Sequence, residues 1–372
     1  MTATRVMHVP RPSRAAAALA ARFGPPAVDP HVTHLVLGQF GLGSCARYRN
    51  LRLARRSLNL VVETSRGTKV VKAYRPHWSQ GSVRCGHSIL MQLEELRFPA
   101  VRLVRSPQGG TWTNVGPQIF AVFDFVPGTN YSIAFLRRRD RLRLTEVAGR
   151  TLAGLHRCLD GFVPAGAHHL GFVAPMGPRQ RNAAWHAAKL DELVRRSADH
   201  PSPTIAPKVA PLVARSSCVL DQIDRLERLL DGAAFPRLVV HGDYGLHNLV
   251  FPRVDLAVPV DFELARFDWR LFDLISVLGK HRYRGGHYDL ESMLAFLGAY
   301  SRNFALTRDE RLLLPEAWKL YKLQAAVQYW NSYFETDGPV RKLAAALDSI
   351  TQADLVAEHP AIIHRLVQGA GG

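Results

Sequence analysis

The stretch that decides the fold runs over residues 241–248 and reads HGDYGLHN. It places Asp243 and Asn248 five residues apart on a loop that enters a β-like run. Asp261 follows at the end of a second β-like run, beyond the turn at Pro252–Asp255. A tight hairpin would bring Asn248 and Asp261 together beside Asp243. The set offers one carboxylate that can accept a proton and an Asn/Asp pair that can hold Mg²⁺, as phosphoryl transfer requires.

The first 127 residues divide into an N-terminal extension, 1–37, and a small lobe, 38–127. The extension is Pro-rich around an Ala-rich stretch that predicts a short helix, with a targeting peptide as the alternative. In the lobe, apolar spacing predicts one helix over 82–96. Runs rich in β-branched and aromatic residues predict strands over 51–54, 58–64, 68–74 and 119–125.

After the break at Pro127-Gly128 the chain becomes mainly helical, and we expect one large lobe over 128–372. The hairpin with the HGDYGLHN stretch lies inside this helical region. The whole pattern predicts an α+β fold with a small β-rich lobe and a larger helical lobe. Apolar periodicity predicts helices over 141–159, 183–196, 214–230, 292–304, 312–334 and 340–347.

The HGDYGLHN run, followed by VDFE at 260–263, resembles the aminoglycoside phosphotransferase / choline kinase family, a small-molecule branch of the protein-kinase-like fold. The family pattern is His-Gly-Asp, four residues, Asn, and an apolar strand that ends in Asp. Asp273 follows Asp261 by twelve residues, as in the family. Three further segments resemble the helix below the catalytic loop, the strand with the phosphate-binding Lys, and the hinge: 152–156, 70–72 and 122–128.

The resemblance implies a two-lobed enzyme with ATP and Mg²⁺, and it implies roles for the matching residues. Asp243 would be the catalytic base or would orient the acceptor hydroxyl, and Asn248 and Asp261 would bind Mg²⁺. The remaining matches imply that Lys72 contacts the α- and β-phosphates, that the backbone near Asp124 and Phe125 meets the adenine, and that His241 and Asp273 support the loop.

The sequence departs from the family pattern at the phosphate-binding loop. Where the family has glycines between the first two strands, this chain has Arg55-Arg56. Arginine presents a planar fork that suits phosphate oxygens, so these two residues could hold phosphate with their side chains. The alternative is a solvated turn. On the helix that usually supplies a Glu partner for the phosphate-binding Lys, His87 stands near the expected place.

Two segments are candidates for the acceptor pocket. The family often has a Gly-Asp-Pro turn after the metal-binding Asp, and this chain has Arg266 and Trp269 there instead. Further along, Tyr329 and Trp330 belong to an aromatic stripe at helical spacing. That stripe could form a wall for a sugar ring or a cationic amine, with ordinary core packing as the alternative.

Composition and charge indicate the size of the core, the location of the protein and the kind of partner. The 372 residues are 47% hydrophobic, enough for a sizeable core, and no apolar run is long enough to span a bilayer. Four scattered cysteines without a CxxC spacing favour a reduced, cytoplasmic location. The net charge is +17, and residues 1–110 carry 17 basic against four acidic residues. Such a basic region suggests an anionic partner.

These observations predict an ATP-dependent phosphotransferase that acts on a hydroxyl of a small molecule, such as an aminoglycoside, another antibiotic, a sugar or an amino alcohol. The alternative is a catalytically weak kinase-like protein that holds an anionic partner through its basic lobe. Nucleic acid is a poor candidate for that partner, because the sequence contains no recognised nucleic-acid motif. The sequence does not predict an oligomeric state.

Overall fold

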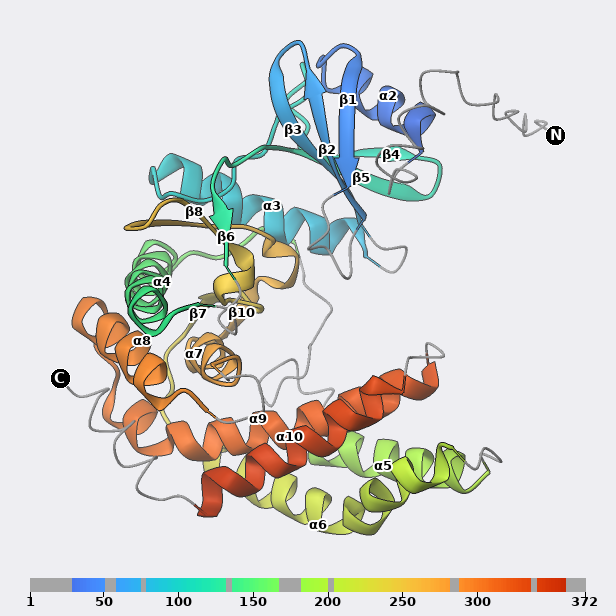
Figure 1. The fold of residues 1–372 in the computed structure, drawn as a ribbon, viewed down its shortest axis with the longest axis vertical. Coiled ribbons are helices and arrows are strands. Elements are labelled where there is room, and N and C mark those ends of the chain that lie inside the picture. Colours follow the sequence, from blue (N-terminus) through green and yellow to red (C-terminus); the bar gives the residue numbers. More distant parts are fainter. Residues whose placement is uncertain are drawn as a thin grey trace. The chain divides into compact units, whose positions relative to one another are not determined.

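The computed structural model describes residues 29–50, 58–74, 78–131, 136–166, 182–199, 204–281, 288–335 and 340–358 (Figure 1). They form two compact units. The first contains the described residues up to Gln80 together with Val101–Val126. The second contains Gly81–Ala100 and the described residues from Pro127 onward.

The first unit is a five-stranded antiparallel sheet with one helix, α2 (Pro30–Gln39). The strand order is β1-β2-β3-β5-β4. Strands predicted over 58–64, 68–74 and 119–125 are confirmed to within one residue, whereas the strand predicted over 51–54 lies outside the described residues. The bounds are β1 Cys45–Asn50, β2 Leu58–Thr64, β3 Gly67–Ala73, β4 Thr113–Val115 and β5 Gln118–Asp124.

Helix α2 lies mostly within the stretch that we expected to be an extension, yet it is packed into this unit. Asp29 caps it, because its Oδ1 accepts from the backbone N–H of His31 at 2.8 Å. The side chains of Val36 and Leu37 are fully buried in a core shared with sheet residues such as Val62. The core of the first unit therefore begins at α2.

The second unit contains the hairpin expected around the HGDYGLHN stretch. One small sheet has the order β6-β8-β9, and a second pairs β10 with β7. In the first of these, Leu249 pairs with Pro259 and Val250 with Val258, as a hairpin turning near Pro252–Asp255 requires. The bounds are β6 Thr129–Asn130, β7 Arg237–Val240, β8 Leu249–Arg253, β9 Leu256–Pro259 and β10 Arg266–Trp269.

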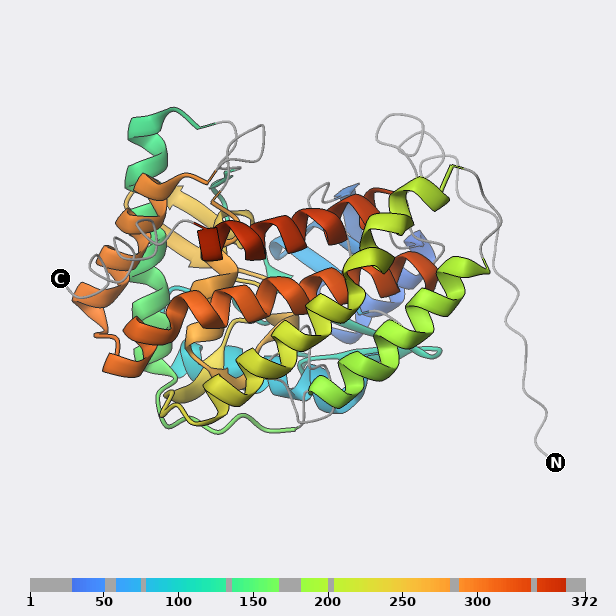
Figure 2. The ribbon, with the colours of Figure 1, turned by 90° about the horizontal axis from the view of Figure 1, so that it is seen from below.

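The remainder of the second unit is helical. All seven helices predicted from periodicity, that over 82–96 included, are present, some with longer bounds, and α7 is an addition. Helix α4 packs against α8, and α9 packs against α10, α6, α5 and α7 (Figure 2). The bounds are α3 Gln80–Glu95, α4 Arg138–Cys158, α5 Ala183–Ala198, α6 Ala206–Asp231, α7 Leu271–Leu278, α8 Leu290–Asn303, α9 Arg308–Glu335 and α10 Arg341–Glu358.

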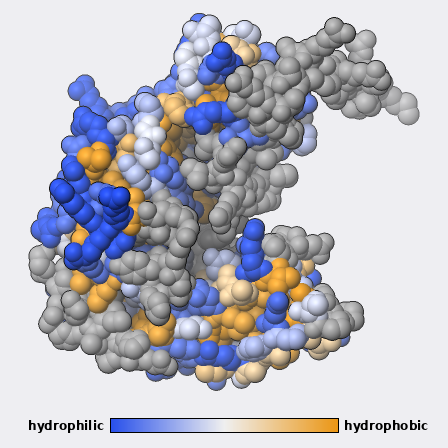
Figure 3. Space-filling view, viewed as in Figure 1, coloured by the Kyte–Doolittle hydropathy of each residue, from blue (hydrophilic) through white to orange (hydrophobic). Residues whose placement is uncertain are grey.

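The structure confirms the predicted α+β class, with a β-rich part followed by a helical part that holds the hairpin. Among the described residues, no helix is both long enough and apolar enough to cross a membrane. Hydrophilic side chains gather over α4 (Figure 3), whose start carries the exposed residues Arg137, Arg138 and Arg139. All four cysteines are free thiols.

Candidate active site

The HGDYGLHN stretch forms the connection from β7 to β8, and its end is a short 3-10 turn, η3 (Leu246–Asn248). The strand before it is buried, so the loop leaves from a fixed point in the core. Gly242 has φ +82°, and an added Cβ would overlap the backbone oxygen of Leu264. Only glycine combines this conformation with that close approach, which explains the second letter of the motif.

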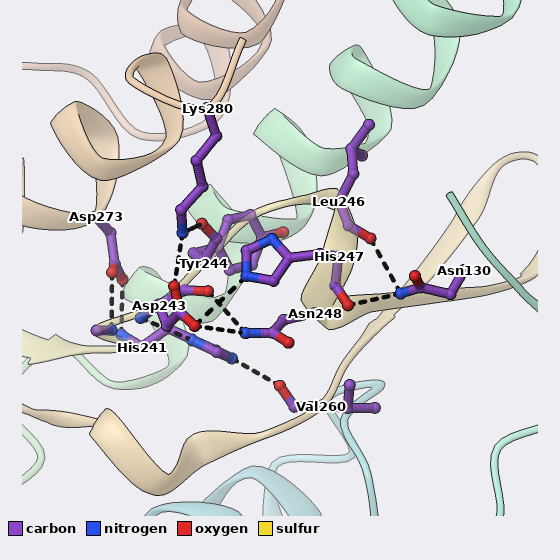
Figure 4. A network of polar contacts seen from close by, with 11 residues as sticks. Asn130, His241, Asp243, Tyr244, Leu246, His247, Asn248, Val260, Asp273 and Lys280 are labelled. Atoms are coloured by element: carbon purple, nitrogen blue, oxygen red, sulfur yellow. Dashed lines mark hydrogen bonds and ion pairs between the residues drawn. The ribbon is translucent and has the colours of Figure 1, made fainter. Parts of the chain in front are cut away.

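One buried carboxylate on α7 holds the start of the loop. Asp273 Oδ2 accepts from the backbone N–H of His241 at 2.6 Å, and Oδ1 accepts from that of Gly242 at 2.9 Å (Figure 4). His156 on α4 donates from Nε2 to Asp273 Oδ2 at 3.1 Å. Burial acts to raise the pKa of Asp273, but these donors outweigh it and hold the pKa below its ordinary value.

A chain of hydrogen bonds continues from Asp273 into the helices. The Tyr300 hydroxyl donates to Nδ1 of His156 at 2.8 Å, which leaves Nε2 of His156 as the donor to Asp273. Tyr244, inside the loop, donates its hydroxyl to the backbone oxygen of Ala148 on α4 at 2.9 Å. Helices α4, α7 and α8 thus fix the loop from its buried side.

His241 is buried and contacts the hairpin. Its Nε2 donates to the backbone oxygen of Val260 at 3.0 Å, and its Nδ1 faces the backbone N–H of Asp243 at 3.4 Å. This pattern requires the neutral ring. Burial lowers the pKa of His241, although nearby carboxylates act in the opposite direction. The contacts are those of a residue that joins the loop to the segment just after β9.

The Asp243 carboxylate lies at the open side of the loop, with its side chain 38% exposed. Lys280 donates to Oδ1 at 2.8 Å, His247 lies 3.4 Å from Oδ2, and Asn248 Nδ2 lies 3.2 Å from Oδ2 (Figure 4). Burial acts to raise the pKa of Asp243, but the Lys280 charge and His247 lower it far below its ordinary value. Asp243 is therefore an ionised carboxylate.

The structure brings Asn248 into contact with Asp243 and next to the residue that precedes Asp261. Asn248 Nδ2 also donates to the backbone oxygen of Asp243 at 2.9 Å, and the backbone N–H of Val260 donates to the oxygen of Asn248 at 3.0 Å. Asp261 follows with φ +65° and ψ +62°, a left-handed conformation that Asp tolerates better than most residues. Hairpin pairing thus places both predicted metal ligands at one end of the strands.

Three residues of this site were not predicted from the sequence. Lys280 follows α7 and contacts Asp243, and His247 lies within the motif itself. Asn130 on β6 directs its amide nitrogen at the backbone oxygens of His247, at 2.7 Å, and Leu249, at 2.9 Å. No local pattern marks Lys280 or Asn130, because both reach the loop only through tertiary packing.

The residues predicted to bind nucleotide lie in the first unit. Lys72 stands on β3 between Asn59 and Ala121, is 5% exposed, and has Nζ 5.3 Å from the centre of the Tyr74 ring. These neighbours place Lys72 on a central strand of the sheet.

Asp124 ends β5, and its Oδ1 accepts from Lys69 Nζ at 2.6 Å. The backbone N–H of Phe125 donates to the oxygen of Thr68 at 3.3 Å. Arg55 and Arg56 lie outside the described residues.

The residues predicted for the acceptor side are engaged within the protein. Arg266 is 3% exposed, and its Nε donates to the buried Asp268 at 2.9 Å. Trp269 packs edge-on against Phe235, with ring centres 4.7 Å apart. On α9, Trp330 is 2% exposed and Tyr329 is half-buried, with Lys342 Nζ 5.3 Å from its ring. The observed contacts of Arg266 and Trp269 are internal to the second unit, and their acceptor role stays a prediction.

Known proteins resemble this chain in sequence and fold. A homoserine kinase from Phenylobacterium zucineum is 24% identical over 281 residues, which are 75% of this chain and 78% of that protein. The structure of a microcompartment-associated aminopropanol kinase superposes with a TM-score of 0.63 at 16% identity, covering 90% of this chain and 99% of that one. Amicoumacin kinase in complex with AMP-PNP, Ca²⁺ and amicoumacin superposes with 0.56 at 12% identity, covering 81% and 86%.

These likenesses confirm the protein-kinase-like fold, and the family assignment comes from the sequence. The model of one family, described as the phosphotransferase enzyme family, matches residues 50–313. The match spans both units, the Lys72 strand and the whole HGDYGLHN loop. The chain is therefore a small-molecule phosphotransferase and belongs to the phosphotransferase enzyme family.

Proposed function

We propose that this protein transfers the γ-phosphoryl group of ATP to a hydroxyl of a small molecule, with Mg²⁺ as the metal. The observation that carries the proposal is the polar network around Asp243 (Figure 4). An ionised carboxylate, an oriented Asn amide and a second Asp are held within one loop and the hairpin that follows it. A catalytically weak binding protein would not need this set, so we favour the enzyme.

In this proposal, Asp243 accepts a hydrogen bond from the acceptor hydroxyl and orients its oxygen toward the γ-phosphorus. The new O–P bond forms as the bond to the β–γ bridging oxygen breaks, and ADP leaves with that oxygen. The hydroxyl proton passes to Asp243 and then to solvent. Because the pKa of Asp243 is far below its ordinary value, the carboxylate orients the hydroxyl and accepts its proton late.

The residues present fit a divalent metal. Both Nδ2 contacts of Asn248 go to Asp243. The amide oxygen Oδ1 of Asn248 therefore points away from Asp243, and it has no partner among the described residues. The Asn248 amide oxygen and the Asp261 carboxylate are hard oxygen ligands of the kind that Mg²⁺ prefers. When bound, the metal would neutralise charge on the phosphates. Asn248 and Asp261 would hold it.

The first unit would bind the nucleotide. Lys72 would contact the α- and β-phosphates, the backbone at Asp124 and Phe125 would meet the adenine, and Arg55 and Arg56 would hold the terminal phosphates. The place of Lys72 on a central strand, where it is 5% exposed, supports this role. The AMP-PNP bound to amicoumacin kinase supports ATP as the donor.

The acceptor is proposed as a small hydroxylated molecule. By their names, the similar proteins act on homoserine, on aminopropanol and on amicoumacin, so an amino acid, an amino alcohol and an antibiotic are all represented. We propose Tyr329 and Trp330, with Arg266 and Trp269, as residues near the acceptor. A cytoplasmic location is part of the proposal, since the four free thiols suit a reducing compartment.

Two measurements on the full chain test the proposed function. MgATP should raise the melting temperature more than ATP with chelator does, because a ligand that binds the folded state stabilises it. An ADP-release assay should then identify an acceptor among amino acids, amino alcohols, sugars and aminoglycosides, with mass spectrometry of the product. Binding of MgATP without transfer to any hydroxyl would contradict the enzyme and favour the binding protein.

A further inference from the structure

A lysine lies directly beside the proposed catalytic carboxylate. Lys280 Nζ donates to Asp243 Oδ1 at 2.8 Å and to the backbone oxygen of Tyr244 at 2.7 Å (Figure 4). An ammonium has three N–H donors, and the third has no partner among the residues that the structure describes. The side chain of Lys280 is 32% exposed and that of Asp243 is 38% exposed, so a group that approaches the carboxylate also approaches this donor.

The backbone around Lys280 fixes its position. Lys280 follows the end of α7, and its own N–H donates to the oxygen of Val277 at 2.8 Å. The next residue, His281, is 3% exposed, and its Nδ1 donates to the same oxygen at 3.0 Å. The loop leaves room for the lysine stem, because a Cβ on Gly245 would lie 3.1 Å from Lys280 Cδ. The ammonium beside Asp243 is therefore part of the fold.

The two oxygens of the Asp243 carboxylate have different surroundings. Oδ1 contacts Lys280, whereas Oδ2 lies 3.2 Å from Nδ2 of Asn248, a proposed metal ligand. A hydroxyl that Asp243 orients thus has a cation near one oxygen of the carboxylate and the proposed metal site near the other. The phosphoryl group that arrives at this hydroxyl spreads its negative charge over three non-bridging oxygens. A metal on one side leaves charge to be stabilised on the other.

We infer that Lys280 is a further catalytic residue, whose third N–H donates to a non-bridging oxygen of the γ-phosphoryl group during transfer. The inference rests on the proposed function. The acceptor O–P bond forms as the bond to the β–γ bridging oxygen breaks, the hydroxyl proton passes to Asp243, and Lys280 keeps all its protons. A cation already held in place stabilises the charge on the phosphoryl oxygens in the transition state, through a charge-assisted hydrogen bond.

The test uses MgADP with aluminium fluoride, a mimic of the phosphoryl group in transfer, and compares it with MgADP alone by isothermal titration calorimetry. In the wild type, fluoride should raise the affinity, as expected of a transition-state analogue. Lys280→Met should lower this gain about tenfold or more, the loss that a hydrogen bond to a charged group predicts, and should leave the affinity for MgADP alone unchanged. A full gain in Lys280→Met overturns the inference.

Two further variants are controls for the loss of charge. Lys280→Arg should keep part of the fluoride gain, because it keeps the positive charge beside Asp243. Lys208→Met removes one positive charge from an exposed position on α6, and it should keep the whole gain. A loss in Lys208→Met as large as that in Lys280→Met would assign the effect to net charge and overturn the inference.

The same titration in an Asp243→Asn background separates contact with the phosphoryl group from a role in holding Asp243. If Lys280 contacts the phosphoryl group, adding Lys280→Met to Asp243→Asn should lower the fluoride gain again. If Lys280 acts solely through Asp243, the second substitution should change nothing, because the residue through which it acts is already altered. That result would leave Lys280 as a positioning residue and overturn the inference.

The outcomes distinguish this inference from the proposed function. Wild-type ADP release that depends on Asp261, together with a fluoride gain that Lys280→Met leaves intact, overturns the inference alone. Where the wild type releases ADP but shows no fluoride gain, kcat for ADP release takes its place, and an unchanged kcat in Lys280→Met overturns the inference. If the wild type shows neither ADP release that depends on Asp261 nor a fluoride gain, the phosphotransferase proposal itself has failed.

Discussion

At the scale of single residues, Asp243 is the side chain on which the proposed chemistry depends. We predict that Asp243→Asn lowers kcat by about 10²–10⁴, the usual contribution of a positioned acid–base group. Nucleotide affinity should be unchanged, because the proposed contacts of Asp243 are with the hydroxyl. Single-turnover transfer and isothermal titration with MgATP measure the two effects. Near-normal turnover on the true acceptor would remove Asp243 from this role.

Lys280 gives a second prediction at this scale. Its charge holds the pKa of Asp243 down, so Lys280→Met should raise that pKa. A group with a lowered pKa stays ionised as the pH falls, and the wild-type rate should show no acid limb from Asp243 above pH 4. In the variant, the kcat/KM profile should gain an acid limb at higher pH.

Lys280→Arg is the control for this effect, because it keeps the charge. It should restore the wild-type profile even where its rate is lower. A profile that is identical in Lys280→Met and wild type would mean that Lys280 does not set the ionisation of Asp243. That result would leave Lys280 as a packing residue.

At the scale of elements, α7 fixes the catalytic loop through one buried side chain. Asp273→Asn keeps the shape of that side chain but replaces one acceptor oxygen by a donor, facing the N–H groups of His241 and Gly242. We predict a loss of about 3 kcal/mol in the free energy of unfolding, the usual effect of breaking a buried charged contact. Urea denaturation measures it, with the exposed Asp221→Asn on α6 as the control.

The same variant has a defined pH dependence. The pKa of Asp273 is lower in the folded than in the unfolded state, so its stabilisation is complete above the unfolded value, about 3.9, and is lost as the pH falls. The difference in stability between wild type and Asp273→Asn should therefore shrink below pH 4. A difference that stays constant down to pH 3 would contradict the lowered pKa.

The segment between β1 and β2, which contains Arg55 and Arg56, gives a prediction about nucleotide binding. If Arg55 and Arg56 hold the terminal phosphates, replacing both with Ala should weaken ATP binding at least about tenfold and leave adenosine nearly unchanged. General surface charge would cost little for either ligand at physiological salt, where the screening length is about 8 Å. Equal, small losses for ATP and adenosine would exclude a phosphate-binding role for Arg55 and Arg56.

The sequence predicted most of the elements and the proximity of the candidate catalytic residues, because both depend on local spacing. The pairing of β8 with β9 follows from a short turn, so the positions of Asn248 and Asp261 could be inferred from their separation along the chain. Lys280 and Asn130 could not, since they reach the loop from segments 37 and about 117 residues away. Such contacts depend on how helices and strands pack.

The aromatic stripe on α9 shows another limit of spacing. Neighbouring residues on a helix point about 100° apart, so Tyr329 and Trp330 lie on opposite sides of the same stripe. Trp330 lies in the core, while Tyr329 lies beside Lys342 of α10. Periodicity indicated a buried stripe correctly, but which neighbour each ring meets depends on the packing of α9 against α10.

At the scale of the whole molecule, the nucleotide and the metal connect the proposed roles of the two units. We predict that Asp261→Ala removes the extra stabilisation that MgATP gives over ATP alone, because Asp261 is the proposed carboxylate ligand. Differential scanning fluorimetry with Mg²⁺ or with chelator measures it. Asp255→Ala, on the exposed turn of the same hairpin, is the control. An unchanged Mg²⁺-dependent shift in Asp261→Ala would place the metal elsewhere.

The hydrogen bonds that hold the catalytic loop have a consequence for how such a protein could diversify. Among the described residues, the hydrogen bonds that this loop receives from outside come from Asp273 on α7, Asn130 on β6, Lys280 and the backbone of Val260 and of Ala148 on α4. None comes from α5, α6, α9 or α10. Mutations in those four helices that leave the packing of α9 against α7 intact would therefore keep these hydrogen bonds. A descendant could change its substrate through the faces of these helices that lie away from α7 and keep the polar network around Asp243.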